Sequence, residues 1–289
     1  MRFMNPYKYW TIAFRRNGGE WEIPDRSKSG IQADPFLAVE NGHHYLFYEK
    51  ADPVTFRGKL VCMDLDARKR KARTILKEPF HLSYPNVFKV RATWYMIPES
   101  KQNHKVTLYH ATEFPWKWEK VKDLLEVDAV DTTFWFKEDK WNFFTYINGA
   151  LHIYTSNADR DGLPQELKEM TGQLPSKRTR PGGNFFTEGN ALYRPAQICE
   201  QFYGEALVFC RQKWNIKTGE YEEEEKKELH AEQIKVPGDD TPIGIHTYNR
   251  VDDMEVVDLY CEQGGIGAFI KKMFYIPLQI IYEKVKGKV

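Results

Sequence analysis

The chain has 289 residues, of which 15% are aromatic, and its formal net charge is +1. So small a charge argues against the strong positive field with which nucleic-acid-binding proteins attract phosphates. The mean hydropathy is −0.62, and no apolar run approaches the roughly 18 residues of a membrane-spanning helix, so no spanning segment is predicted.

The cellular compartment follows from the N-terminal residues and the cysteines. The segment from Met1 to Phe14 lacks the basic and then apolar order of a secretory signal. The cysteines are scattered and show no CxxC spacing, which favours reduced thiols over a metal cluster; they are Cys62, Cys199, Cys210 and Cys261. We therefore expect a cytoplasmic protein that uses no metal and no cofactor.

One short pattern occurs four times, with apolar strands that begin after Asp34, Tyr84, Asp131 and Gly182. These positions are 50, 47 and 51 residues apart, a period typical of the blades of a β-propeller. Alternating apolar residues and turn signals predict the strands of these four blades. The predicted strands cover 36–39, 44–49, 59–64, 72–76, 86–90, 93–98, 106–110, 118–125, 134–137, 141–146, 151–155, 184–186, 191–196, 206–211 and about 221–229.

The remaining strands predict how the ring closes. Residues 244–250 and 255–259 supply part of a last blade, and 10–14 and 21–23 precede the first one. Because an N-terminal strand added to the last blade removes an open sheet edge, we predict an all-β, five-bladed propeller over residues 1–265. Four blades with an appended unit are the alternative.

The tail, residues 266–289, is predicted to be a short C-terminal extension. Apolar residues such as Phe269, Met273 and Ile281 alternate with lysines there. A packed terminal strand or helix is one interpretation, since Pro277 interrupts the helical periodicity. A basic amphipathic segment in peripheral contact with a membrane is the other.

In a propeller the first strand of each blade starts, and the second ends, at the same mouth of the channel. Fifteen residues separate these two points in each copy, which pairs Asp34 with Glu49, Tyr84 with Glu99, Asp131 with Tyr146, and Gly182 with Gln197. The register therefore predicts that these polar side chains converge. Arg180, Arg194 and His246 are expected at the same rim, whereas the run Glu222–Glu225 is expected on the solvated face of an outer strand.

Converging carboxyl groups suit glycoside chemistry. Cleavage of an acetal needs one carboxylic acid to protonate the leaving oxygen and one carboxylate to activate water or attack the sugar. Arginines bind anionic groups on a ligand, and aromatic rings stack on sugars. Each residue also has a structural interpretation: Asp34 precedes a proline and can stabilise its own turn, and His246 can be a core residue.

The motifs around Asp34, Glu49, Tyr84, Glu99 and Asp131, with Arg180-Pro-Gly-Gly and Tyr-Arg194-Pro-Ala-Gln197, resemble the N-terminal domain of glucosamine inositolphosphorylceramide transferases. The resemblance covers about residues 10–258 and implies a five-bladed propeller similar to family 43 and family 32 glycosidases. It implies that Asp34 is the base or nucleophile and that Asp131 orients it and tunes its pKa. The fourth-blade acid of family 43 is replaced by the Arg180 motif, so Glu99 is the expected acid.

Two functions from different classes follow. The first is a glycosidase-like enzyme, for hydrolysis or glycosyl transfer, that uses Asp34, Glu99 and Asp131 on an anionic or phosphorylated surface glycan or its precursor. Glu49, Tyr84, Arg180, Arg194, Gln197 and His246 would bind its glycan, sugar-phosphate or sugar-nucleotide ligand. The second is a non-catalytic glycan-binding module that supports a glycosyltransferase. A purely structural scaffold is a third interpretation.

Overall fold

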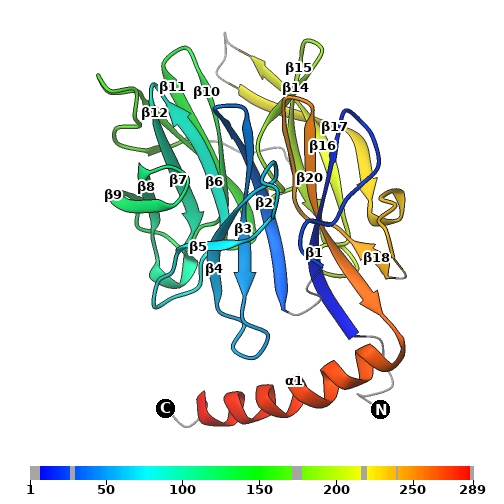
Figure 1. Ribbon diagram of the computed structural model, residues 1–289. Coiled ribbons are helices and arrows are strands. Elements are labelled where there is room, and N and C mark those ends of the chain that lie inside the picture. The colour runs from blue at the N-terminus through cyan, green and yellow to red at the C-terminus, as the bar shows by residue number, and fades with distance from the viewer. Residues whose placement is uncertain (1–6, 27–29, 171–177, 216–219, 239, 287–289) are drawn as a thin grey trace.

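The computed structural model describes residues 7–26, 30–170, 178–215, 220–238 and 240–286. These ranges are mostly β-strand, as predicted, with one α-helix, α1 (Gly265–Lys286), after the last strand. Two 3-10 turns, Lys101–Asn103 and Ala231–Gln233, lie between strands. Figure 1 shows the strands grouped into upright sheets and α1 lying across one end of the molecule.

Three antiparallel sheets of four strands each follow the second, third and fourth predicted repeats. Each sheet keeps its strands in chain order, because short hairpins join them. The strands are β6 (Ser83–Val90), β7 (Thr93–Glu99), β8 (Val106–Glu113), β9 (Lys117–Leu125), β10 (Val130–Lys137), β11 (Lys140–Ile147), β12 (Ala150–Asn157), β13 (Lys168–Glu169), β14 (Phe186–Glu188), β15 (Ala191–Ile198), β16 (Ala206–Asn215) and β17 (Glu220–His230).

The fourth sheet has eight strands and joins the first predicted repeat to the last strands of the chain. Strand β1 is antiparallel to β20 over ten residue pairs and meets β2 in parallel only at Trp10 and Ile31. The N-terminal strand thus joins the last unit, as predicted, whereas the division of this sheet into two blades stays a prediction. Its strands are β1 (Tyr7–Arg16), β2 (Ile31–Glu40), β3 (His43–Ala51), β4 (Gly58–Asp64), β5 (Arg73–Leu76), β18 (Thr241–Gly244), β19 (Tyr248–Val251) and β20 (Met254–Gln263).

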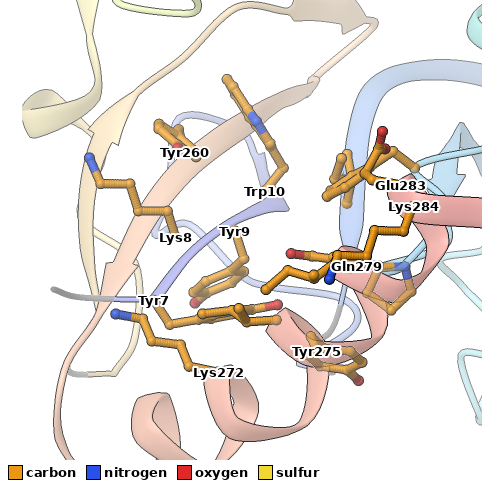
Figure 2. A pocket seen from close by; sticks show the side chains of 16 residues that line it. Tyr7, Lys8, Tyr9, Trp10, Tyr260, Lys272, Tyr275, Gln279, Glu283 and Lys284 are labelled. Atoms are coloured by element: carbon orange, nitrogen blue, oxygen red, sulfur yellow. The ribbon is translucent and has the colours of Figure 1, made fainter. Parts of the chain in front are cut away.

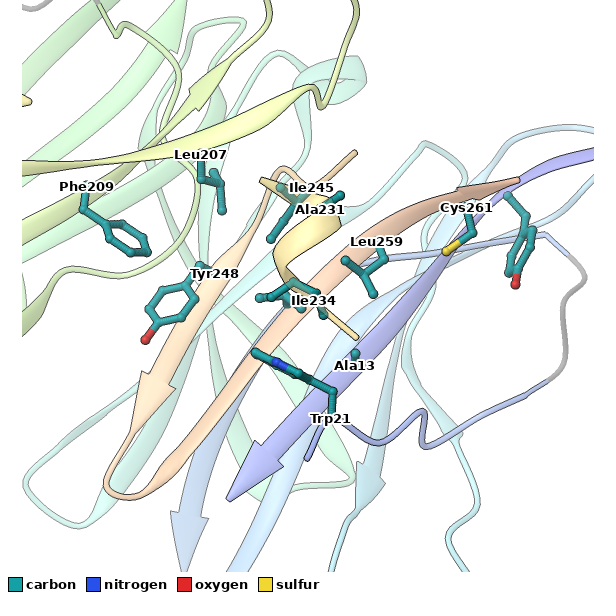
Figure 3. Packing of buried hydrophobic residues seen from close by; sticks show 12 residues of the cluster. Ala13, Trp21, Leu207, Phe209, Ala231, Ile234, Ile245, Tyr248, Leu259 and Cys261 are labelled. Carbon is teal, nitrogen blue, oxygen red and sulfur yellow. The ribbon is translucent and has the colours of Figure 1, made fainter. Parts of the chain in front are cut away.

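Apolar clusters pack each sheet against the next. Phe47 of β3 and Trp118 of β9 belong to one cluster, and Leu108 of β8 and Trp141 of β11 belong to the next. A third joins β11 and β12 to β17, and a fourth packs Leu207 and Phe209 of β16 against Tyr248 and Leu259 (Figure 3). The contacts therefore return to the eight-stranded sheet, and burial of both faces of the sheets provides the main stabilising free energy.

The tail differs from the prediction that Pro277 interrupts it. Helix α1 is 22 residues long and continues through Pro277 without a break. The proline costs one backbone hydrogen bond, and it lies at an exposed position of the helix. This helix is not long and apolar enough to cross a membrane. Lys288, counted in the predicted basic segment, lies outside the described residues.

Candidate functional site

The same β-bulge occurs near the start of the first strand in three successive repeats. The register shifts between Ala33 and Phe36, between Ser83 and Asn86, and between Val130 and Thr133. The residues that begin the predicted repeats, Asp34, Tyr84 and Asp131, have positive φ angles of 53°, 45° and 51°. Positive φ at a non-glycine residue costs about 1–3 kcal/mol, and such strain gathers at functional sites. The bulge re-aims the side chain of each of these residues.

Asp34 lies in a buried cluster with His246 and Asp258. The Nε2 atom of His246 is 3.3 Å from Oδ1 of Asp34, and its Nδ1 atom is 2.8 Å from Oδ2 of Asp258. The Thr247 hydroxyl donates to Oδ1 of Asp34 at 3.0 Å, and the backbone N–H of Asp34 donates to Asp258. Burial by itself lowers the pKa of His246. The carboxylates of Asp258 and Asp34, one on each side of the ring, outweigh this effect and raise the pKa above its ordinary value. The imidazole therefore orients Asp34 and partly neutralises it.

Three carboxyl groups at this site hold their protons more tightly than usual. Burial raises the pKa of Asp34 to about 6, and neighbouring carboxylates add to the effect. Burial, together with the charges of Asp34 and its neighbours, raises the pKa of Glu49 well above its ordinary value. The pKa of Glu99 is raised well above its ordinary value by burial and by the nearby charge of Asp131. The protonated forms of Glu49 and Glu99 are therefore favoured more than those of ordinary carboxyl groups, beside Asp34 with its pKa of about 6.

Asp131 is held by two donors from the neighbouring repeat. Its Oδ2 atom accepts hydrogen bonds from Nε of Arg180 at 2.5 Å and from Nε2 of Gln197 at 3.0 Å. The guanidinium of Arg180 lies 4.9 Å from the ring centre of Tyr203 and 5.9 Å from that of Tyr146. Because Arg180 keeps part of its side chain exposed, it can reach an anionic group of a ligand while it holds Asp131.

The structure brings together eight of the nine site residues that the sequence predicts. Asp34, Glu49, Glu99, Asp131 and His246 are linked by the contacts and charge interactions described above, and the backbone N–H of Tyr84 donates to Asp34. Gln197 and Arg180 join them through Asp131, and the Tyr84 hydroxyl accepts a hydrogen bond from the N–H of Gly183 at 2.8 Å. The structure thus places these eight side chains near one another, whereas their role as a site at the mouth of a channel stays a prediction.

Arg194 differs from its prediction. Its Nε and Nη2 atoms lie 2.6 and 2.8 Å from the carboxylate of Glu223, and the side chains are 0% and 3% exposed. The sequence predicts that the run Glu222–Glu225 lies on a solvated strand face. For Glu223 this prediction is wrong, because its side chain is buried. The guanidinium of Arg194 is thus engaged in a buried ion pair between β15 and β17, two strands of the same sheet.

Four residues near this mouth escaped the sequence prediction: Trp10, Tyr203, Thr247 and Asp258. Trp10 and Tyr203 pack on the imidazole of His246, with ring centres 4.3 and 5.1 Å away. Asp258 is fully buried and accepts hydrogen bonds from the backbone N–H groups of His246 and Thr247. A lone carboxylate inside the apolar run Val256-Val257-Asp258-Leu259 is the signal that marks it.

One trio in the described part of the chain has the geometry of a cation site. The ligand atoms of Asp34, His246 and Asp258 lie within 4.8 Å of one another. Both carboxylates are already engaged by N–H and O–H donors, and the imidazole lies between them. Nδ1 of His246 lies 2.8 Å from Asp258 but makes no hydrogen bond of good geometry, so the trio is a candidate position for a cation and a metal-free site stays a prediction.

Comparisons with known proteins show the family to which the chain belongs. Residues 23–251 match the family described as glucosamine inositolphosphorylceramide transferase 1, N-terminal. The chain is 30% identical over 217 residues to glucosamine inositolphosphorylceramide transferase 1 of Arabidopsis thaliana, covering 67% of this chain and 28% of the relative. It is 33% identical over 189 residues to the protein of that name from Oryza sativa subsp. japonica, covering 61% of this chain and 25% of the relative.

Solved structures show the fold. The catalytic domain of a Coprinopsis cinerea GH62 α-L-arabinofuranosidase superposes with a TM-score of 0.60 at 12% identity, over 90% of this chain and 98% of that one. An α-L-arabinofuranosidase from Podospora anserina superposes with a TM-score of 0.56 at 13% identity, over 89% of this chain and 97% of that one. The chain thus has a fold shared with glycoside hydrolases. Its match over most of its length shows that it belongs to the family of glucosamine inositolphosphorylceramide transferase N-terminal domains.

Proposed function

We propose that this protein is a carbohydrate-active enzyme of the glycosidase type, which hydrolyses or transfers a glycosyl group of an anionic or phosphorylated glycan or its precursor. One observation carries this proposal: two carboxyl groups at one mouth, Asp34 and Glu99, have environments that separate their protonation states. Paired carboxyls with separated pKa values are the machinery of glycoside chemistry.

Glu99 is the general acid. Burial and the charge of Asp131 raise the pKa of Glu99, which favours the protonated form that can donate to the leaving oxygen. Asp34, with a pKa of about 6, is mostly ionised and is the base or nucleophile. Asp131 positions Glu99 and, with Arg180, sets the charge around it.

The position of Arg180 is the argument for an anionic ligand. It occupies the rim, next to the aromatic rings of Tyr146 and Tyr203. Glu49, Tyr84, Gln197 and His246 line the site with it, while we assign Arg194 a structural role. The name of the plant relatives, which contains inositolphosphorylceramide, supports a phosphorylated partner. Since the chain spans about a quarter of those relatives, hydrolysis and transfer both remain within this proposal.

We further propose that the sheets form a five-bladed propeller in which β1 closes the ring through β20. The cycle of apolar contacts between the sheets and the position of the mouth support this arrangement. We assign the protein to the cytoplasm, where thiols stay reduced.

A non-catalytic glycan-binding module is the second candidate. The observation that favours it lies in the fourth repeat, where Arg180, followed by Gly182 and Gly183, stands before β14 in place of a carboxyl group. Such a site binds a glycan but lacks a carboxyl group at this position. Under this alternative, Glu99 has no catalytic task.

The test is turnover of sugar nucleotides, glycosyl phosphates and anionic oligosaccharides by purified protein, followed by chromatography of the released sugar. Asp34→Asn and Glu99→Gln should each lower kcat by about 10²–10⁴ fold with little change in ligand affinity. Glu126→Gln, an exposed carboxyl with 77% side-chain accessibility, is the matched control. Binding without turnover, unchanged by Glu99→Gln, would establish the binding module instead.

A further inference from the structure

Helix α1 turns its apolar side outward. Ala268 and Lys272 are its buried residues, whereas the opposite side carries a band of exposed apolar side chains. Phe274 is 64% exposed and Ile270 is 60% exposed. The exposed apolar residues of the helix are Ile266, Phe269, Ile270, Met273, Phe274, Leu278, Ile280, Ile281 and Val285. A band of this size and continuity marks a contact surface.

The inner side of α1 contacts the body of the protein only in part. Nε2 of Gln279 donates to the carbonyl oxygen of Pro53 at 2.8 Å, and Nζ of Lys271 donates to Oε1 of Gln263 at 3.0 Å. Between helix and sheet lies a cavity of about 1070 Å³, lined by aromatic residues such as Tyr7, Trp10 and Tyr275 (Figure 2). The hydrogen bonds to the body of the protein are made by polar side chains of the helix, and the apolar band therefore faces away from the body.

The charge of α1 complements an anionic surface. Residues 265–286 include four lysines and one glutamate, Glu283, a net charge of 4 − 1 = +3. The whole chain carries +1, so the rest of the chain carries 1 − 3 = −2. Lys284 and Lys286 are exposed in the last turn. Positive charge is thus concentrated on the one element that also exposes the apolar band.

We propose that α1 is a membrane-docking helix that lies in the interface of an anionic lipid bilayer. Its band would enter the boundary between headgroups and acyl chains, and the exposed Lys284 and Lys286 would meet anionic headgroups. A second copy of this chain is a poorer occupant, since it would bring one +3 helix against another. The helix follows the residues matched by the family model, which end at residue 251.

Docking would hold the candidate site beside the bilayer. Trp10 lines the cavity under α1 and also packs on His246, with ring centres 4.3 Å apart. The helix and the acidic mouth are therefore neighbours on one end of the molecule. This placement favours a glycan substrate that is attached to a lipid, an inference that rests on the proposed function.

The test is co-sedimentation of the full chain with vesicles of phosphatidylcholine, with and without phosphatidylserine. We expect binding that requires phosphatidylserine and weakens with salt. Ile270→Glu and Phe274→Glu should each weaken it by about tenfold or more. Lys284→Ala and Lys286→Ala should each weaken it by about fivefold. Val121→Glu, at an exposed apolar position of β9, is the matched control and should leave binding unchanged.

Circular dichroism and size-exclusion chromatography accompany each variant. Failure of the folded wild-type protein to bind anionic vesicles would overturn the proposal, as would a dimer that Phe274→Glu dissociates. Turnover of a water-soluble substrate should be unchanged by Phe274→Glu. Loss of vesicle binding with normal turnover therefore separates this inference from the catalytic one.

Discussion

The backbone N–H of Tyr84 donates a hydrogen bond to Oδ2 of Asp34 at 3.3 Å, although 50 residues separate them. Both residues occupy the same position of their repeats and both have positive φ. The hydroxyl of Tyr84 in turn accepts a hydrogen bond from the backbone N–H of Gly183, which precedes β14 in the fourth repeat. Equivalent positions of different sheets therefore contact one another directly, and the acidic site is built from these contacts.

The rate of turnover should depend on the ionisation of Asp34. Its pKa is about 6, so the base is lost as pH falls below this value, and kcat/KM should fall about tenfold per pH unit there. A pH–rate profile, with the folded state checked at each pH by circular dichroism, measures this limb. A flat profile through this region would remove Asp34 from the mechanism.

Asp34 should also make folding stability depend on pH. The folded pKa of about 6 exceeds the reference value of 3.8, so between these values the folded state holds a proton that the unfolded state has released. Stability therefore falls as pH rises through this window, by about 3 kcal/mol, and stays low above it. The raised pKa values of Glu49, Glu99 and His246 act in the same direction.

Asp34→Asn removes this contribution. The variant should lose less stability than the wild type between the two pH values, as measured by urea unfolding across the range. Asp139→Asn is the control, because this exposed carboxyl belongs to a β-hairpin turn outside the site. Identical pH profiles for wild type and Asp34→Asn would contradict the assigned pKa.

Arg194 is expected to stabilise the folded state rather than to bind a ligand. Arg194→Met leaves the buried carboxylate of Glu223 without its bidentate partner, and the loss should be about 3–5 kcal/mol. The double variant Arg194→Met/Glu223→Leu should recover a large part of this loss, since no charge is then buried. Denaturant unfolding measures both. Unchanged stability with weakened ligand binding would instead restore the ligand-binding role that the sequence suggests.

Gly183 should tolerate no side chain. A Cβ atom there would lie 1.9 Å from the carbonyl oxygen of Tyr248, at a φ of +133°. Gly183→Ala should therefore cost about 3 kcal/mol or more, because backbone must move. Gly264→Ala has nothing within 4 Å and should change stability by less than about 0.5 kcal/mol. Thermal unfolding compares the two, and equal melting temperatures would contradict the close approach.

Much of the site was determined by the sequence alone, for a local reason. Successive strands repeat the same spacing, and a hairpin places the start of one strand beside the end of the next. That rule brings Asp34 to Glu49 and Tyr84 to Glu99, and the period of the repeats brings the pairs together. The mostly β fold follows from the same alternation of apolar residues.

Contacts between distant residues were decided only by the tertiary structure. Asp34 meets Asp258 across 224 positions, and Arg194 turns to Glu223 because burial leaves its charge no other compensation. Pro277 predicts a break, but α1 continues through it, and the same turn is tied to the body by the hydrogen bond from Gln279 to Pro53. Burial and charge pairing depend on which surfaces meet in space, and no local spacing encodes them.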